Sequence, residues 1–307
     1  MATANTRVSN FGRRARGTSS GRPLTLGTQI LLQLICLFLA FTVLYPIAWV
    51  VSRSIDPSTL NRPTSLLPEG ATLDAYRAVL TQPTTNPVSF ARLALNTILL
   101  AGGVTVFALA IAVSAAYAFS RLKFPGRSQL MLGVLGVLML PAVAGIAPLF
   151  VLLNRIVIGG FNLRNSLFGV GLAMTSGALP FAIWNLKGYL DTIPKELEEA
   201  ATIDGATRNQ TFLRIVLPLA TPVLAVTAFL VFLGGWTEFY LSWQFLTEPK
   251  NFTLSMALYN MVGQYAGQTP WSRFTAMALI IALPVAVVYL ALQKYIVGGL
   301  TVGGVKG

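Results

Sequence analysis

Residues 93–120 read LALNTILLAGGVTVFALAIAVSAAYAFS, a run without a single Asp, Glu, Lys or Arg. A helix needs about 20 apolar residues to cross the hydrocarbon core of a bilayer, and a charge at its centre would cost roughly 3 kcal/mol. The run also lacks the strict alternation, in segments of about ten residues, that is typical of membrane β-barrels. It therefore predicts a transmembrane helix.

Five further runs without charged residues occupy 24–52, 128–154, 165–186, 215–237 and 274–293. The chain of 307 residues is 54% hydrophobic and 10% charged, with a mean hydropathy of +0.68, whereas soluble domains carry about 25% charged residues. The sequence thus predicts an all-α integral membrane protein. Its six transmembrane helices are expected at about 26–52, 93–119, 129–153, 166–187, 216–240 and 273–296.

The basic residues are distributed unequally between the two sets of loops. Fourteen Lys and Arg residues fall in the set that includes both termini, and eight fall in the opposite set. By the positive-inside rule both termini are cytoplasmic. The net charge of +12 then reflects membrane topology first, and nucleic-acid binding is the weaker interpretation. The basic arm at 1–23, rich in Ser, Thr, Gly and Arg, is expected to be disordered.

The composition excludes several kinds of catalytic and metal-binding site. Histidine is absent and Cys36 is the only cysteine, which excludes Ser/His/Asp or Cys/His catalysis, Cys/His zinc sites and a disulfide within one chain. No GxxxxGK[S/T] pattern occurs, so the chain has no P-loop for nucleotide phosphates. We expect no catalytic residue, no metal and no cofactor bound by this chain.

One predicted cytoplasmic loop, residues 191–218, reads DTIPKELEEAATIDGATRNQTFLRIVLP and holds five of the ten acidic residues. Pro194 suits a first helical turn, and three glutamates lie near the positive end of the helix dipole. The helix should run to about Ile203, and Gly205 should then adopt the left-handed conformation of a C-cap.

The second half of this loop predicts another short helix. Thr207 and Gln210 have the spacing of a capping box, and Pro218 is expected to stop the helix. With the small residues Ala200 and Ala201 at the elbow, the two helices form a compact knob that a partner backbone can approach closely. The alternative is a re-entrant cap packed on its own bundle.

The predicted external segment 241–271 places aromatic residues among Asn and Gln. Aromatic faces and amides suit sugars, but an aromatic belt at the bilayer interface explains Trp243 and Trp271 equally well. Glu238, near the outer end of the fifth run, is either exposed to water or a buried gate element.

Several of these residues match a known motif in type and spacing. Glu199-Ala200-Ala201, followed by Gly205, Ile215 and Leu217-Pro218 at fixed spacing, resembles the EAA motif of the membrane (permease) subunits of ABC importers. The stretches 117–126 (YAFSRLKFPG), 187–189 and 197–206, and the chain end VGGLTVGGVKG, resemble the carbohydrate-uptake branch. The similarity is greatest to the smaller membrane subunit of the maltose/maltodextrin importer and covers nearly everything after Leu24.

The resemblance implies a six-span domain over 24–300, with a coupling-helix loop at 191–218 and a cytoplasmic tail at 301–307. In the family the loop docks on an ATP-hydrolysing partner, which implies coupling roles for Glu198, Glu199, Ala200, Ala201, Asp204, Gly205, Ala206, Ile215, Leu217 and Pro218. The tail, too Gly-rich for a helix, would contact the ATPase through Gly303, Gly304, Val305, Lys306 and Gly307. The external loop would contact an extracytoplasmic sugar-binding protein through Gln244, Tyr259, Asn260, Gln264 and Tyr265.

The implied function is that of a permease subunit, not an enzyme, in the inner membrane of a bacterium, carrying maltose/maltodextrin-type oligosaccharides. Its partners would be a second EAA-bearing membrane subunit, a homodimeric ABC ATPase that binds ATP and Mg²⁺, the sugar-binding protein and the bilayer. Alternatives are the same machinery for trehalose, another oligosaccharide or glycerol phosphate, a membrane-embedded glycosyltransferase, and a secondary carrier, which more often shows intramembrane charges.

Overall fold

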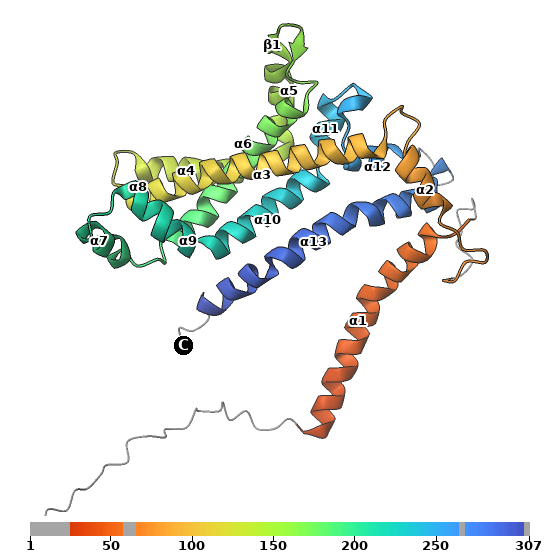
Figure 1. Ribbon diagram of the computed structural model, residues 1–307, viewed down its shortest axis with the longest axis horizontal. Helices are drawn as coiled ribbons and strands as arrows, with labels where there is room; N and C mark the ends of the chain where they lie inside the picture. The colour runs from red at the N-terminus through yellow and green to blue at the C-terminus, as the bar shows by residue number, and fades with distance from the viewer. Residues whose placement is uncertain (1–24, 58–65, 264–267, 304–307) are drawn as a thin grey trace, which may run out of the picture. The chain divides into compact units, whose positions relative to one another are not determined.

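The computed structural model describes residues 25–57, 66–263 and 268–303, so the predicted arm at 1–23 lies outside the described residues. The described chain is mostly helical (Figure 1). Four of its helices are long and apolar enough to cross a membrane: α1 (Leu26–Ser54), α3 (Phe90–Arg121), α6 (Leu167–Leu190) and α13 (Trp271–Gly303). They coincide with the first, second, fourth and sixth runs predicted from the sequence.

Two bent pairs of helices occupy the other predicted spans, which gives up to six spans if each pair is one. In the third run, α4 (Arg127–Leu138) is followed by the short 3₁₀ turn η1 (Ala142–Gly145) and by α5 (Ile146–Arg155), with a bend of 97°. Pro141 causes the break, because it lacks an N–H and disfavours a helical conformation at the preceding residue.

In the fifth run the straight helix is α10 (Thr221–Thr237), which begins five residues later than predicted. The preceding helical segment, Arg208–Leu219, meets it at 74°. The ring of Pro222 would clash with the carbonyl of Pro218 in a continuous helix. The hydroxyl of Thr221 donates to that carbonyl at 2.7 Å instead.

The chain divides between Ala48 and Trp49, within α1, into two units that are described separately. In the second unit the end of α1 is fixed by a buried Arg53–Asp56 ion pair and by a 2.7 Å hydrogen bond between Ser54 and Tyr76 of α2 (Asp74–Thr81). The hydroxyl of Ser272 in α13 donates to the carbonyl of Asp56 at 2.7 Å.

Helix α3 is the centre of the bundle, because it packs along both α6 and α10, and α10 packs in turn against α13. Its packed face is built of small residues: Ala101, Ala108, Ala112 and Ala116 are fully buried. At Gly235 of α10 a Cβ atom would lie 2.8 Å from the Ala101 Cα atom. Only glycine therefore permits this approach, in the way that small residues favour close helix packing in membranes.

Two apolar clusters follow from this packing. The larger one lies toward α11 (Tyr240–Phe245) and α12 (Leu254–Asn260) and includes Leu93 and Leu100 of α3 with Phe245 and Met277. The smaller one surrounds the C-terminal end of α3 and is formed by Ala112, Ala116, Ala182, Ile183, Leu186, Leu190, Ile193, Val216, Ala220 and Val223. The second cluster supports the loop that carries the EAA-like motif.

The loops on the side opposite to the knob contain short elements. Strands β1 (Val157–Ile158) and β2 (Phe161–Asn162) form an antiparallel hairpin, the one strand pair among the described residues. Its turn is Gly159-Gly160, both with positive φ, as a two-residue hairpin turn requires. After α10 come α11, the 3₁₀ turn η3 (Pro249–Asn251) and α12. The buried Asn96 amide of α3 donates to the carbonyls of Lys250 and Phe252, both at 2.8 Å.

The prediction that the Gly-rich tail cannot be helical is wrong for its first residues. Helix α13 continues through Gly303, and residues 304–307 lie outside the described residues. Extending a long helix avoids the cost of nucleation, so each Gly adds only about 1 kcal/mol relative to Ala.

Candidate functional site

The loop from Asp191 to Leu219 folds locally as its sequence indicates. Helix α7 (Glu196–Ile203) begins after Pro194 and has three glutamates in its first turn. The chain reverses at Gly205, whose φ is +82°, and the Ala206 N–H donates back to the carbonyl of Ala201 at 2.9 Å. These are the features of a left-handed C-cap.

The second helical segment of the loop starts at the predicted capping box. The Gln210 N–H donates to Thr207 Oγ1 at 3.3 Å, and the Thr207 N–H donates to Gln210 Oε1 at 2.8 Å. Helix α8 (Arg208–Thr211) then passes through the π-helical turn η2 (Phe212–Val216) into α9 (Leu217–Leu219). The prediction that Pro218 stops this helix is off by one residue, because the helical segment continues through Pro218 and ends at Leu219.

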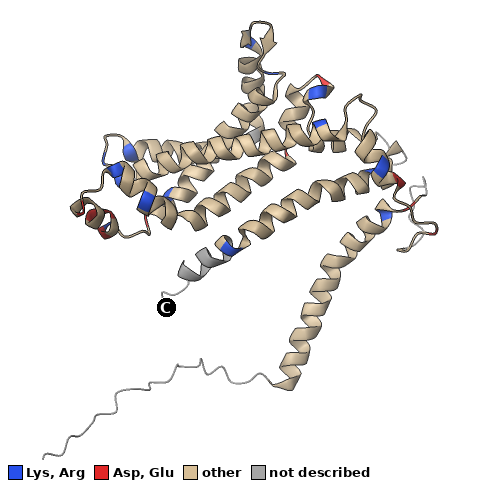
Figure 2. Ribbon diagram, in the orientation of Figure 1, with Lys and Arg blue, Asp and Glu red and all other residues tan. Residues whose placement is uncertain are grey.

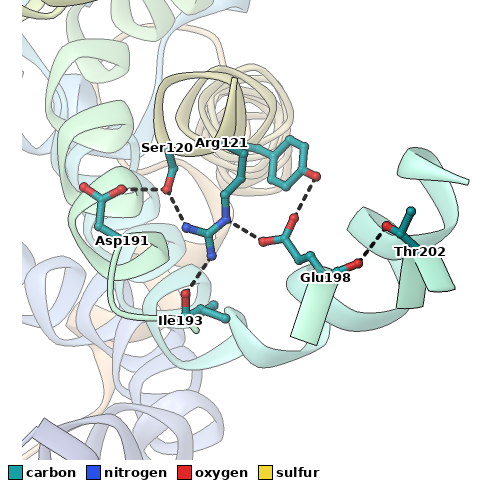
Figure 3. Close-up of polar contacts among 7 residues, drawn as sticks. Ser120, Arg121, Asp191, Ile193, Glu198 and Thr202 are labelled. Carbon is teal, nitrogen blue, oxygen red and sulfur yellow. Dashed lines mark hydrogen bonds and ion pairs between the residues drawn. The ribbon is translucent and has the colours of Figure 1, made fainter. Parts of the chain in front are cut away.

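Arg121, the last residue of α3, connects the bundle to this loop (Figure 3). Its Nε donates to Glu198 Oε1 at 2.5 Å, and its Nη2 donates to the carbonyl of Ile193 at 2.8 Å. The Tyr117 hydroxyl donates to the other Glu198 oxygen at 3.0 Å. The side chains of Arg121 and Glu198 are 6% and 15% exposed, so this is a largely buried ion pair whose charges are hydrogen-bonded on both sides.

The network continues to the beginning of the loop. Arg121 Nη1 donates to Ser120 Oγ at 3.2 Å, and Ser120 Oγ donates to Asp191 Oδ1 at 2.6 Å. Lys187 of α6 pairs with Asp191 Oδ2 at 2.5 Å. Burial raises the pKa of the Asp191 carboxyl, but the hydrogen bonds from Lys187 and Ser120 and the charges of Lys187 and Arg121 outweigh it, so the pKa lies below its usual value.

On the opposite face of α7, the acidic side chains form no ion pair with any residue that the structure describes. Glu199, Ala200 and Asp204 are exposed, and Ile203 is 87% exposed. Figure 2 shows this helix as the place where acidic residues gather, beyond the end of the long helices. The loop therefore presents a surface of acidic, small and apolar side chains on a helix that is anchored from behind.

The other residues of the predicted coupling set are less exposed or lie at the edge of this face. Ala201 is buried, Ala206, Ile215 and Leu217 are half-buried, and Pro218 is exposed on α9. Glu198 faces inward to Arg121 rather than outward. Of the predicted tail contacts, Gly303 ends α13, and Gly304, Val305, Lys306 and Gly307 lie outside the described residues.

The predicted outer contacts fall on α11 and α12. Gln244 is half-buried, Tyr259 and Asn260 are exposed, and Gln264 and Tyr265 lie outside the described residues. The ring of Tyr259 stacks on Phe239 with centroids 4.8 Å apart. This places one of the predicted contacts in an exposed aromatic group at the outer end of α10.

Glu238 is half-buried and caps the N-terminus of α11. Its carboxylate accepts hydrogen bonds from the N–H groups of Leu241 and Ser242 and from the Ser242 hydroxyl, at 2.5, 3.2 and 2.7 Å. These contacts give the residue a structural role in the loop.

Sequence reasoning missed the anchor behind α7. The stretch 117–126, which contains Tyr117, Ser120 and Arg121, carries part of the family resemblance. Nothing in that stretch indicates that Arg121 pairs with an acidic side chain of the loop. The available signal was the acidic loop itself, since a largely buried Glu198 requires a cation nearby.

The arrangement joins the end of α3 to the α7 loop through hydrogen bonds and ion pairs. Among the described residues, no group of three His, Cys, Asp or Glu side chains could hold a metal ion. Several helices long and apolar enough to cross a membrane, with one anchored acidic helix beyond their ends, place the chain in the class of helical membrane proteins.

A family comparison identifies the class more closely. Residues 108–302 match the model of the family described as binding-protein-dependent transport system inner membrane component. The chain belongs to this family. It is a transport subunit rather than an enzyme, and the resemblance to ABC importer permeases is confirmed.

Two relatives and one solved structure agree with this assignment. The chain is 36% identical over 281 residues to the trehalose/maltose transport system permease protein MalG of Thermococcus litoralis, covering 91% of this chain and 97% of the relative. It is 34% identical to the galactooligosaccharides transport system permease protein GanQ of Bacillus subtilis, covering 89% and 94%. A bacterial ABC transporter involved in the import of alginate has the same fold, with a TM-score of 0.73 at 24% identity, covering 87% of this chain and 96% of that chain.

Proposed function

We propose that this chain is one of two membrane subunits of an ATP-driven importer for neutral oligosaccharides of the maltose/maltodextrin type. Its exposed α7 face docks on a separate ATPase that binds ATP and Mg²⁺. An extracytoplasmic sugar-binding protein delivers the sugar to the opposite side. Differential binding of these partners to outward-open and inward-open states would drive the alternation between them.

The observation that carries this proposal is the two-sided character of α7. Its inner face is fixed to α3 by the Arg121–Glu198 pair, whereas Glu199, Ala200 and Ile203 are exposed on the other side. An exposed apolar residue among acids, on an anchored helix, suits a partner with a basic and apolar recess. The EAA-like motif lies on this helix and the turn after it.

The proposed topology has six spans, with α4 to α5 and the Arg208–Thr237 segment counted as one span each. Both termini, the basic arm and α7 are then cytoplasmic, which agrees with the excess of basic residues in that set of loops. The tail from Gly303 contacts the ATPase, and Gln244, Tyr259 and Asn260 contact the binding protein.

Relatives with different named substrates support alternative sugars. The Thermococcus relative is named for trehalose and maltose, and the Bacillus relative for galactooligosaccharides. Trehalose and galactooligosaccharides are therefore the substrates to compare with maltose. The alternatives of a glycosyltransferase and of a partner-free carrier do not agree with the family.

The test is reconstitution. The chain is purified with the second membrane subunit, the ATPase and the binding protein of the proposed importer, and the complex is placed in liposomes. Uptake of radiolabelled maltose, maltotriose, trehalose and galactobiose is measured with Mg-ATP on the ATPase side. We expect sugar uptake that requires all partners and ATP. Uptake by the chain alone, or uptake without ATP, would overturn the proposal.

A further inference from the structure

Arg121 joins α3 to the loop that carries α7, through Glu198 and the carbonyl of Ile193. Covalently, the loop that carries α7 continues from α6 and leads into α9 and α10. A displacement of α7 would therefore reach α6 and α10 through the chain. The loop is not covalently adjacent to α3, so a direct effect of α7 on α3 depends on noncovalent contacts between them, which include hydrogen bonds to a side chain and to a backbone carbonyl.

Within the described residues, the polar contacts from α3 to this loop come from Tyr117, Ser120 and Arg121. Arg121 contributes most, because its planar group contacts both Glu198 of α7 and the carbonyl of Ile193 before it. The rings of Tyr117 and Phe212 lie in tilted contact, with centroids 4.8 Å apart, and add an apolar contact to the second half of the loop.

This contact is costly to disrupt, because both side chains are largely buried. Without Arg121, the Glu198 carboxylate would retain the Tyr117 hydroxyl and lose its charge partner. A buried charge left without its partner destabilises the local arrangement strongly. The loop would then be expected to shift away from α3 while its ends stay attached to α6 and α10.

Helix α3 is well suited to pass on such a displacement. Its 32 residues extend about 48 Å and pack along α6 and α10, and its outer end holds the η3 loop through Asn96. A motion delivered to the cytoplasmic end of this one helix would thus reach both neighbours and the outer loop.

We infer that Arg121 is a positioning residue for transport, which ties the coupling loop to α3 so that a displacement of α7 also moves α3. The inference rests on the proposed function of α7 as the docking helix. It predicts that loss of Arg121 separates ATP hydrolysis from sugar movement, instead of reducing both together.

The test uses the complete complex in liposomes with a mixture of radiolabelled maltose, trehalose and galactobiose, and measures sugar transported per ATP hydrolysed. For Arg121→Gln we expect this ratio to fall roughly tenfold, an ordinary magnitude for coupling between sites, with ATP hydrolysis retained. A merely structural role would reduce the number of active complexes and leave the ratio unchanged. Arg121→Lys should restore part of the ratio, because it keeps the charge but not the planar fork.

Lys123→Gln is the matched control. It also removes one positive charge, but Lys123 lies two residues after Arg121 and its side chain is exposed. Its ratio should equal that of the unsubstituted chain. If Arg121→Gln does not assemble, Tyr117→Phe removes one hydrogen bond to Glu198 and should lower the ratio by about twofold to threefold. An unchanged ratio in the assembled variant overturns the inference. Absence of ATP-dependent uptake by the unsubstituted complex would instead refute the proposed function.

Discussion

The loop around α7, which we propose to be cytoplasmic, precedes α10, and the loop from α11 to α12, which we propose to be the outer loop, follows it. The two loops are built differently. The cytoplasmic loop is shaped by local signals and fixed by an ion pair and a carboxylate–lysine contact. The outer loop is held by amides that reach backbone carbonyls far away in the sequence, such as Asn96 to Phe252. Its core is apolar, with Phe245 fully buried.

This difference shows that the two loops depend on different contacts. The loop around α7 presents exposed side chains beside its buried ion pair, whereas the outer loop depends on close packing and buried amide hydrogen bonds, which permit few alternatives. We therefore expect substitutions on the exposed face of α7 to change transport more than stability. Substitutions near the outer loop should change stability first.

The largest effect is expected from Glu199→Lys or Gly205→Asp, which should abolish sugar uptake while insertion and folding stay largely intact. Glu199 is exposed and forms no ion pair with a described residue, so the new charge disrupts the partner surface and no internal contact. At Gly205 a Cβ atom would meet nothing within 4 Å, but the φ of +82° strains any other residue. Asp tolerates positive φ better than most residues, so we expect the loss of stability to be small. Uptake in liposomes and yield of the assembled complex are the measurements.

Glu196→Lys provides the control for this pair, since Glu196 is an exposed acid on α7 outside the EAA-like motif. It should retain most of the uptake. Normal uptake by both Glu199→Lys and Gly205→Asp would show that α7 does not couple to a partner.

At the outer loop, Asn96→Leu should lower the free energy of unfolding of the chain without changing any exposed surface. The Asn96 side chain is 1% exposed, and both of its hydrogen bonds would be lost, leaving the Phe252 carbonyl unpaired. We expect a loss of about 3 kcal/mol, or roughly 8 °C in the Tm of the detergent-solubilised chain. Asn209→Leu, on the exposed surface of α8, should leave the Tm unchanged, and an equal decrease in both variants would contradict the assignment.

A smaller decrease in Tm is expected for Gly235→Ala, at the close approach of α10 to α3. The added methyl group would lie 2.8 Å from the Ala101 Cα atom, which is backbone and cannot rotate away. Such overpacking costs about 2 kcal/mol, or roughly 5 °C. The adjacent Gly234→Ala meets nothing within 4 Å and should be neutral or slightly stabilising, because Ala is the better helix former.

The same contrast explains what the sequence could predict. The apolar runs, the α7 helix, the turn at Gly205 and the capping box at Thr207 all depend on local chemistry, and the structure agrees with them. The break at Pro141 and the late start of α10 follow from prolines inside apolar runs, where the sequence does not show whether a proline kinks a helix or ends it. The continuation of α13 follows from the low cost of extending an existing helix. The role of Arg121 depends on Glu198, 77 residues away, which a single sequence cannot pair with it.

The smallest effect, and the one that separates charge from packing within the cytoplasmic loop, is expected at Asp191. The pKa of the Asp191 carboxyl is lowered in the folded state. Its contacts therefore stabilise the fold fully above the ordinary carboxyl pKa of about 3.9. This stabilisation is lost as the pH falls through the lowered pKa. The side chain is 41% exposed, so solvent screens the effect.

Asp191→Asn should reduce Tm slightly at pH 7, and the difference from the unsubstituted chain should shrink as the pH falls below about 4. Asp204→Asn, an exposed acid without an ion pair among the described residues, should show no such convergence. A difference for Asp191→Asn that stays constant over the whole pH range would mean that shape and hydrogen bonding, and not charge, hold this end of the loop.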